Sequence, residues 1–269
     1  MMHEPGIPDH LTPLKVACPQ RLDGRWRSDQ HDDGYRGGGN ARQEVETVFH
    51  RACQVDELFQ NHISVVAELG FGAGLSILET IQRFRQVASP HARLCLISLE
   101  QFPIDPNVLK EMLMHDGAAP DLVSALIDQW PIHVGGWHRL SFLEGRVHLT
   151  LGLGDAADLL PTMNFKADAW FLDGFSPAKN PDLWTPKVLK MVTDRSASGA
   201  RLGTWCSAGD VRRTLTELGW AVERVPGHAT KRHRLEARRS GTTPNRPSPG
   251  NIHIAGAGFA GAGAARAFA

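Results

Sequence analysis

The sequence lacks long hydrophobic runs and lacks an excess of charge of either sign. No segment of its 269 residues approaches the roughly 20 consecutive apolar residues that a membrane-spanning helix needs. Its 29 Lys and Arg balance 29 Asp and Glu, so overall charge does not draw the chain to nucleic acid or to a membrane. Any basic surface that binds an acidic partner must therefore be local.

Features of metal sites and of secreted proteins are also missing. The 4 cysteines are scattered and form no C-x-x-C pair, and the 13 histidines show no metal-ligand spacing. The first residues, MMHEPGIPDH, contain no basic start followed by an apolar stretch, so we expect no secretory signal. We predict no metal and no membrane contact, and a cytoplasmic location.

The chain divides by composition into four segments. Residues 1–40 are rich in Gly, Pro, Asp and Arg and are predicted to form an irregular N-terminal arm. Residues 41–240 carry regular apolar patterns and are predicted to form one domain. Residues 241–250 have the Pro, Ser and Gly content of a linker. Residues 251–269 begin with a short strand pattern and the glycine turn GAGFAG.

Within residues 41–240, apolar runs typical of buried strands alternate with helical patterns. The alternation predicts an α/β fold with a mostly parallel sheet and helices on both faces. Two runs near the end lie too close together for a crossover helix, so they are predicted to pair antiparallel. This is the Rossmann-like sheet of class I methyltransferases. The predicted strands are residues 64–68, 94–99, 147–153, 167–172, 201–206, 220–225 and 233–238.

A glycine loop, ELGFGAG over residues 68–74, follows the first predicted strand and precedes a helix. Glycines let the backbone turn sharply and let a ligand approach closely. The spacing of Gly70, Gly72 and Gly74 is G-x-G-x-G, which favours S-adenosylmethionine over a dinucleotide. Glu68 beside the loop would suit this cationic ligand, directly or through water.

Two further carboxylates follow the next strands. Glu100 ends the second strand, where a carboxylate can accept hydrogen bonds from ribose hydroxyls. Asp155 ends the third, where it can meet an adenine amino group. The alternative is a tight strand–helix turn with incidental surface acids. We predict a binding site for S-adenosylmethionine formed by these residues and the glycine loop.

The loop DGFSPAKNP opens directly after the fourth strand. Asp173 is predicted to orient a substrate amine, with acceptance of its proton as a further role, because only an unprotonated amine has a free lone pair. Phe175 is predicted to stack on the target base. Lys179 is predicted to contact a phosphate or to support the loop. The alternative is that Asp173 caps a turn and Phe175 fills the core.

Residues 224–239 hold six Lys or Arg and are the densest basic segment. Lys231 and Arg232 lie in the turn between the two closing strands and are candidate contacts to an RNA backbone. A solvated charged surface is the alternative. Trp170, Trp184 and Trp205 lie in or beside apolar elements and are predicted to belong to the core.

These segments together resemble the methyltransferase domain of the MnmC family, the bifunctional enzymes of tRNA wobble-uridine modification. The resemblance covers roughly residues 20–240. Its most specific part is the run WFLDGFSPAKNPDLW, and the chain departs from the family at RWRS, where an aromatic–aromatic–Ser stretch is usual. The other matching segments are residues 44–49, 68–74, 98–103, 154–155, 207–213 and 231–234.

The resemblance implies methylation of the amino group of 5-aminomethyl-2-thiouridine, giving 5-methylaminomethyl-2-thiouridine. It implies tRNA, through its anticodon stem-loop, as the partner. Full-length members carry a second domain that binds FAD, and residues 251–269 are similar to its beginning. We expect no FAD binding by so short a piece. We also expect a monomer.

Two other functions are compatible with the sequence. One is a nicotinamide- or flavin-dependent oxidoreductase that uses the first glycine loop as a dinucleotide site. The G-x-G-x-G spacing and Asp155 argue against it. The other is a non-catalytic RNA-binding module that has kept a methyltransferase fold.

Overall fold

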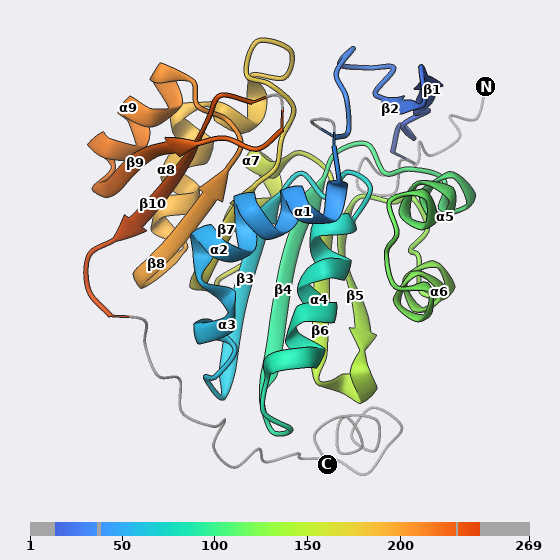
Figure 1. Ribbon diagram of the computed structural model, residues 1–269, viewed down its shortest axis with the longest axis horizontal. Helices are drawn as coiled ribbons and strands as arrows, with labels where there is room; N and C mark the ends of the chain where they lie inside the picture. Colours follow the sequence, from blue (N-terminus) through green and yellow to red (C-terminus); the bar gives the residue numbers. More distant parts are fainter. Residues whose placement is uncertain (1–13, 37–38, 230, 243–269) are drawn as a thin grey trace, which may run out of the picture.

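The structure is a computed structural model that describes residues 14–36, 39–229 and 231–242. Its centre is an eight-stranded sheet in the order β5-β6-β4-β3-β7-β8-β10-β9 (Figure 1). The strands are β3 (Ile63–Leu69), β4 (Arg93–Glu100), β5 (Gly136–Phe142), β6 (Val147–Leu153), β7 (Ala167–Leu172), β8 (Ser196–Thr204), β9 (Trp220–Pro226) and β10 (His233–Arg239).

The middle of the sheet is parallel and its two sides are antiparallel. Strands β6, β4, β3, β7 and β8 run in one direction. Strand β5 pairs antiparallel with β6, and β10 pairs antiparallel with both β8 and β9. The predicted class, a mostly parallel Rossmann-like sheet with a late antiparallel strand, is confirmed.

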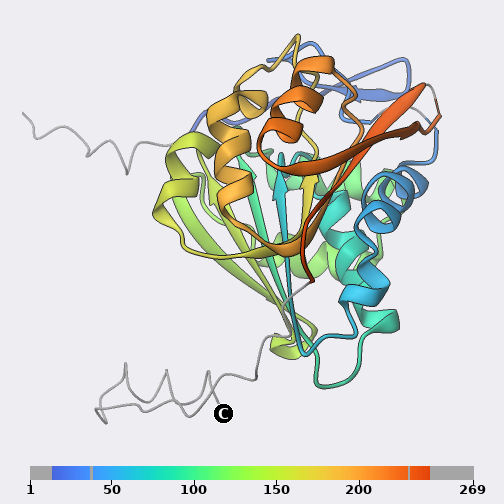
Figure 2. The ribbon, with the colours of Figure 1, turned by 90° about the vertical axis from the view of Figure 1, so that its left-hand side faces the viewer.

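Helices cover both faces of the sheet, as Figure 2 shows with the sheet seen between two helical layers. One layer contains α1 to α6, and the other contains α7 to α9. The helices are α1 (Ala41–Val45), η2 (Glu46–His50), α2 (Arg51–Cys53), α3 (Val55–Leu58), α4 (Leu75–Val87), α5 (Pro106–His115), α6 (Pro120–Asp128), η3 (Leu143–Gly145), α7 (Ala156–Leu159), η4 (Leu160–Thr162), η5 (Asp182–Trp184), α8 (Pro186–Asp194) and α9 (Gly209–Glu217).

Strand β3 illustrates why the central strands are apolar along their whole length. Side chains alternate between the faces of a strand, so Val65 packs into the layer of α7–α9 and Val66 into the layer of α1–α6. Because helices cover both faces of the sheet, a polar side chain at either position would lose contact with water and lower the stability of the fold. This burial fixes the strand tips, and hence the loops that follow them, at one edge of the sheet.

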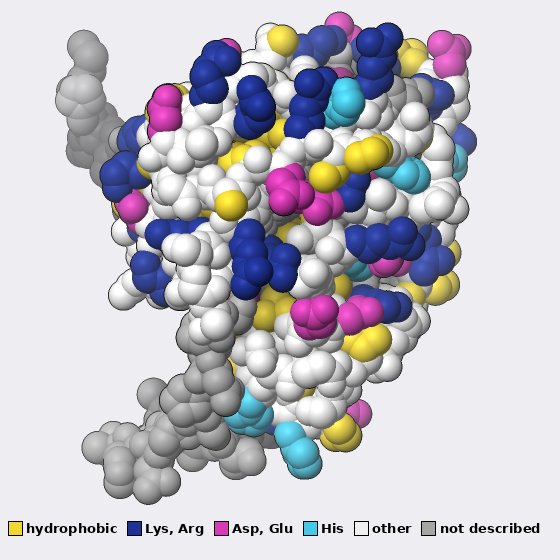
Figure 3. Space-filling view, turned by 60° about the vertical axis from the view of Figure 1, so that its left-hand side comes forward, with side chains coloured by type: hydrophobic (Ala, Val, Ile, Leu, Met, Phe, Trp, Pro, Cys, Tyr) yellow, Lys and Arg dark blue, Asp and Glu magenta, His cyan; other side chains and the backbone are white. Residues whose placement is uncertain are grey.

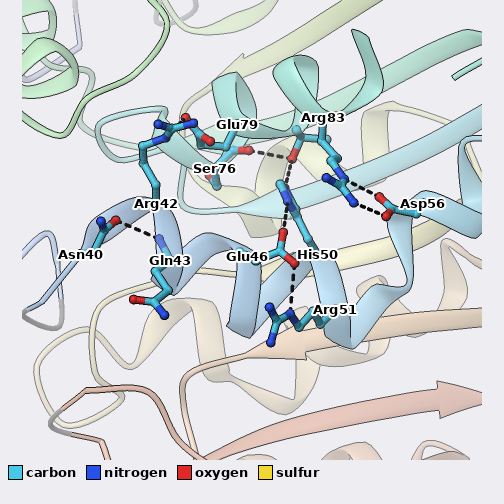
Figure 4. Close-up of polar contacts among 11 residues, drawn as sticks. Asn40, Arg42, Gln43, Glu46, His50, Arg51, Asp56, Ser76, Glu79 and Arg83 are labelled. Atoms are coloured by element: carbon cyan, nitrogen blue, oxygen red, sulfur yellow. Dashed lines mark hydrogen bonds and ion pairs between the residues drawn. The ribbon is translucent and has the colours of Figure 1, made fainter. Parts of the chain in front are cut away.

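The short helices before β3 are held against α4 by polar contacts, which Figure 4 shows. The Arg42 Nε donates to Glu79 Oε1 at 2.9 Å. A hydrogen bond of 3.0 Å joins His50 Nε2 to Thr80 Oγ1 inside the packed interface. These contacts fix the end of the N-terminal arm beside the helix that follows the glycine loop. A third pair joins Arg83 of α4 to Asp56 of α3.

Two elements differ from the sequence prediction. Strand β5 was not predicted, because only Leu140 and Phe142 of its seven residues are buried and it lies at the sheet edge. Strand β8 was predicted over residues 201–206 but covers Ser196–Thr204, since its first residues, SASG, have low strand propensity. The other predicted strands match to within one or two residues.

Part of the predicted domain organisation falls beyond what the structure describes. The strand and glycine turn predicted within residues 251–269 lie outside the described residues, as do residues 243–250 of the linker. Of the predicted arm, residues 14–36, 39 and 40 are described, and they include the hairpin of β1 (Gln20–Leu22) and β2 (Arg25–Arg27). In the described part of the chain, no helix combines the length and hydropathy needed to cross a membrane.

Candidate functional site

A cavity of about 760 Å³ lies at the carboxyl ends of the parallel strands. This edge is where open α/β sheets bind ligands, and the volume falls within the roughly 300–1,000 Å³ of small-molecule sites. The cavity brings together seven of the predicted site residues, which are Gly70, Gly72, Glu100, Asp155, Asp173, Phe175 and Lys231. The other four, Glu68, Gly74, Lys179 and Arg232, lie outside its lining.

The glycine loop adopts a backbone that only glycine allows without strain. Gly70, Gly72 and Gly74 have φ values of +88°, +52° and +72°. A Cβ on Gly70 would lie 2.8 Å from the backbone oxygen of Asp173, and one on Gly74 would lie 2.5 Å from the ring of Phe71. Gly70 and Gly72 therefore shape the cavity wall, whereas Gly74 lets the ring of Phe71 pack against the loop.

Glu100 and Asp155 line the cavity at the tips of two adjacent strands, β4 and β6. Glu100 accepts hydrogen bonds of 2.8 Å from the backbone N–H groups of Gly72 and Phe102, so it also fixes the glycine loop. Burial raises its pKa above the ordinary value. Asp155 accepts a 2.7 Å hydrogen bond from the N–H of Ala157 and caps α7. Asp155 therefore caps the helix through one carboxyl oxygen, and its side chain still borders the cavity.

Asp173 follows β7 and is half-buried in the cavity wall. Burial, together with the charge of the nearby Glu44, raises its pKa to about 7 against the opposing charge of Arg36. The side chain of Trp205 hydrogen-bonds to the carboxylate and lowers the pKa. A carboxylate with a pKa near neutrality is suited to accept a proton at physiological pH.

Phe175 lies in the cavity wall and not in the core, so the core-filling alternative is wrong. Its ring centroid lies 5.0 Å from that of His31 and 5.3 Å from that of Tyr35. Its backbone oxygen accepts a 2.7 Å hydrogen bond from Trp184 Nε1, which anchors the loop. These aromatic groups form a surface on which a planar base can stack.

Glu68 is fully buried below the glycine loop, so the structure gives no support to its expected direct contact with a ligand. Ser98 Oγ donates to one carboxyl oxygen at 2.5 Å, and Ser76 Oγ donates to the other. Burial, and then the charge of Asp173, raise the pKa of Glu68 to about 8. Glu68 thus joins β3, β4 and α4 beneath the site.

The burial of Glu68 leads us to predict how the stability of the fold depends on pH. Because the pKa of Glu68 rises from 4.5 to about 8 on folding, the folded state binds the proton more tightly. The free energy of unfolding should therefore fall as pH rises from 4.5 to 8, by at most about 1.4 kcal/mol per pH unit. Glu68→Gln removes this titrating group. The free energy of unfolding of the variant, minus that of wild type, should therefore increase as pH rises over the same range.

Urea denaturation of both proteins at pH 5, 6.5 and 8 measures the difference. The Asp158→Asn variant, on the exposed side of α7, serves as the control and should track the wild type. A constant difference between Glu68→Gln and wild type across this range would contradict the proposed protonation of the buried carboxyl.

The three predicted basic residues occupy different surroundings. Lys179 pairs with Asp32 Oδ2 at 3.1 Å, so of its two predicted roles the contact favours support of the loop. Lys231 lies with its Nζ 4.3 Å from the ring centroid of Trp205 and borders the cavity. Arg232 is exposed in the turn between β9 and β10.

Sequence reasoning missed the contribution of the N-terminal arm. Residues 27–36 supply much of the cavity wall, including Tyr35 and Arg36, and Asp33 Oδ2 accepts a 3.0 Å hydrogen bond from the Ser176 N–H. Irregular segments carry no periodicity, so the only available signal was the cluster of Asp, His and Arg beside the chain's one tyrosine. Trp205 was predicted in the core and is instead half-buried at the cavity.

Comparison with known proteins gives a consistent result. Residues 118–240 match a family model described as S-adenosyl-L-methionine-dependent methyltransferase. The chain is 38% identical over 248 residues to the tRNA 5-methylaminomethyl-2-thiouridine biosynthesis bifunctional protein MnmC of Caulobacter vibrioides, which covers 92% of this chain and 42% of that protein. It is 40% identical over 221 residues to MnmC of Pseudomonas aeruginosa strain UCBPP-PA14, covering 81% of this chain and 34% of that protein.

Among solved structures, the fold is similar to MNMC2 from Aquifex aeolicus, with a TM-score of 0.65 and 24% identity over 87% of this chain and 73% of that one. The chain spans less than half the length of the curated relatives it matches. The resemblance predicted from the sequence is thereby confirmed.

Proposed function

We propose, from the similarity of this chain to the methyltransferase part of MnmC proteins, that it methylates a tRNA wobble base. The donor is S-adenosylmethionine, and the acceptor is the primary amine of 5-aminomethyl-2-thiouridine, which becomes 5-methylaminomethyl-2-thiouridine. The observation that carries the proposal is that Glu100, Asp155 and Asp173 meet the glycine loop in one cavity. Three strand ends thus offer acceptors to one ligand.

The residues of the cavity fit the proposed cofactor. Glu100 lies where it can accept hydrogen bonds from two ribose hydroxyls, and Asp155 where it can accept one from an adenine amino group. Gly70 and Gly72 line the cavity with backbone alone, and the missing Cβ at Gly70 lets the loop after β7 pack against the glycine loop. When bound, S-adenosylmethionine supplies an electrophilic methyl group on a positively charged sulfur.

Asp173 then acts on the acceptor. Its carboxylate accepts a hydrogen bond from the substrate amine and takes a proton, which leaves the nitrogen lone pair directed at the methyl carbon. Trp205 holds the carboxylate in place through its hydrogen bond. Phe175, supported by Tyr35 and His31, stacks on the base that carries the amine.

Basic side chains near the cavity mouth are proposed to bind the anticodon stem-loop. Lys231 borders the cavity, and Arg232 is exposed in the same turn. Figure 3 shows several groups of Lys and Arg side chains on one face of the molecule, with Asp and Glu side chains among them. Such local density offers contacts to phosphates although the net charge is zero. Exposed Arg212 and Arg213 of α9 add to the basic residues.

The remaining predictions complete the proposal. The methyltransferase domain covers residues 41–240, together with the part of the arm that lines the cavity. We propose a monomer that acts in the cytoplasm, where its tRNA substrate would be found. FAD binding by residues 251–269 alone is not expected.

The direct test incubates the protein with labelled S-adenosylmethionine and tRNA that carries 5-aminomethyl-2-thiouridine, followed by mass analysis of nucleosides. The expected product is the methylated nucleoside, heavier by one labelled methyl group. Binding of NAD in place of S-adenosylmethionine would favour the oxidoreductase alternative. Binding of S-adenosylmethionine without transfer to this tRNA would refute the proposed acceptor.

A further inference from the structure

The lining of the cavity is strongly acidic, which conflicts with part of the proposed cofactor. Among the residues that the structure describes, eight Asp or Glu side chains and four Lys or Arg side chains line it. S-adenosylmethionine carries a carboxylate on its amino-acid portion, and a carboxylate placed among acidic groups without a cation is strongly disfavoured. A basic side chain of the lining is therefore the natural partner for this carboxylate.

Three of the four basic side chains are poorly suited to this role. Arg27 is already paired with Asp32 at 2.8 Å, and its side chain is 40% exposed. Arg25 is exposed on β2. Lys231 lies over the ring of Trp205, on the Asp173 side where the acceptor amine must enter.

Arg36 differs from them in burial and in its hydrogen bonds. Its side chain is 20% exposed, and its Nε donates to Asp116 Oδ2 at 3.0 Å. Its Nη1 donates to the backbone oxygen of Tyr35 at 3.0 Å. Its Nη2 is buried and has no hydrogen-bond partner among the described residues. An unpartnered buried donor on a guanidinium costs free energy unless an acceptor, such as a ligand carboxylate, occupies the space.

The position of Arg36 also matches the geometry that the proposed function requires. The ring of the preceding residue, Tyr35, lies 3.7 Å from the place of a Cβ on Gly72, so Arg36 is held close to the glycine loop. Its charge acts on both Glu68, below that loop, and Asp173, across the cavity. With adenosine at Glu100 and Asp155 and the methyl group at Asp173, the amino-acid portion is left to pass over the glycine loop toward Arg36.

We propose that Arg36 binds the carboxylate of the amino-acid portion of S-adenosylmethionine, held in place by Asp116. Arginine suits this task because its planar guanidinium presents several donors in fixed directions to a carboxylate. The pairing with Asp116 fixes the guanidinium before the ligand arrives, so little side-chain entropy is lost on binding. The inference rests on the proposed function, since it assumes that this cofactor occupies the cavity.

The test compares two ligands that share the adenosine portion. S-adenosylhomocysteine has the carboxylate, and 5′-methylthioadenosine has no amino-acid portion. In isothermal titration, Arg36→Met should weaken S-adenosylhomocysteine binding roughly 10- to 100-fold, the loss typical of a hydrogen bond between charged groups. It should leave 5′-methylthioadenosine binding unchanged, which also shows that the variant is folded. Arg36→Lys, which keeps the charge, should recover part of the loss.

Arg21→Met is the matched control, because Arg21 is an exposed arginine of the same arm outside the cavity lining. It should bind both ligands as wild type does. Equal loss of both ligands in Arg36→Met and in Arg36→Lys, or no loss of S-adenosylhomocysteine, would overturn the assignment. Weaker binding of tRNA alone would do the same and would point to a phosphate contact. If the wild type bound neither ligand, the proposed function itself would fail.

Discussion

Asp173→Asn is expected to slow methyl transfer to tRNA by about 100- to 10,000-fold, the usual contribution of a positioned general base. Asparagine keeps the size of the side chain and can still accept the hydrogen bond from Trp205. It cannot take a proton from the substrate ammonium. Single-turnover rates with labelled S-adenosylmethionine and tRNA carrying the unmethylated amine measure the loss.

The same carboxylate should set the pH dependence of the wild type. With the pKa of Asp173 raised to about 7, the basic form predominates above pH 7 and is lost below it. The single-turnover rate should therefore fall toward tenfold per pH unit as the pH drops below about 7. The residual rate of Asp173→Asn should lack the break near pH 7 that this carboxyl produces.

Two controls separate chemistry from folding in this experiment. Titration with S-adenosylhomocysteine should give Asp173→Asn an affinity within a few-fold of wild type. The Asp158→Asn variant, which replaces an exposed aspartate outside the cavity lining, should keep the full rate. A wild-type rate for Asp173→Asn would remove the proposed base and favour a non-catalytic RNA-binding module.

The parts of the site that the sequence predicted lie at strand ends. Glu100, Asp155 and Asp173 each follow an apolar run, and the tips of parallel strands meet at one edge of a sheet. Their convergence on one cavity therefore follows from the strand assignment alone. The same rule placed Glu68 near the ligand, but Glu68 is one residue inside its strand, and its side chain points into the packed layer.

The rest of the site depends on contacts between segments far apart in the sequence. Arg36 meets Asp116 across 80 residues, and Asp33 meets Ser176 across 143. Neither pair leaves a local pattern, because an irregular arm is placed by the surface on which it packs. Strand β5 was missed for a related reason, since an edge strand with one exposed face needs little apolar sequence.

Gly70→Ala is expected to reduce methyl transfer at least about 100-fold. The reason is that Gly70 is where the glycine loop packs against the loop after β7, which carries Asp173. The added Cβ would lie 2.8 Å from the backbone oxygen of Asp173 and 3.2 Å from the nitrogen of Gly174. Both are backbone atoms, so the loop after β7 must move as a whole and carry Asp173 and Phe175 with it. A shift of about 1 Å in a reacting group costs roughly 100-fold in rate.

The variant should also lose stability, since the φ of Gly70 is +88° and alanine in that region costs about 1–2 kcal/mol. Gly219→Ala isolates that cost: Gly219 has a φ of +87°, and a Cβ there would meet no atom of the described residues within 4 Å. Both variants should therefore unfold at lower urea concentration than wild type, but only Gly70→Ala should lose methyl transfer. Equal activity in the two variants would mean that backbone strain alone matters at Gly70, and that the loop after β7 does not depend on close contact with the glycine loop to place Asp173.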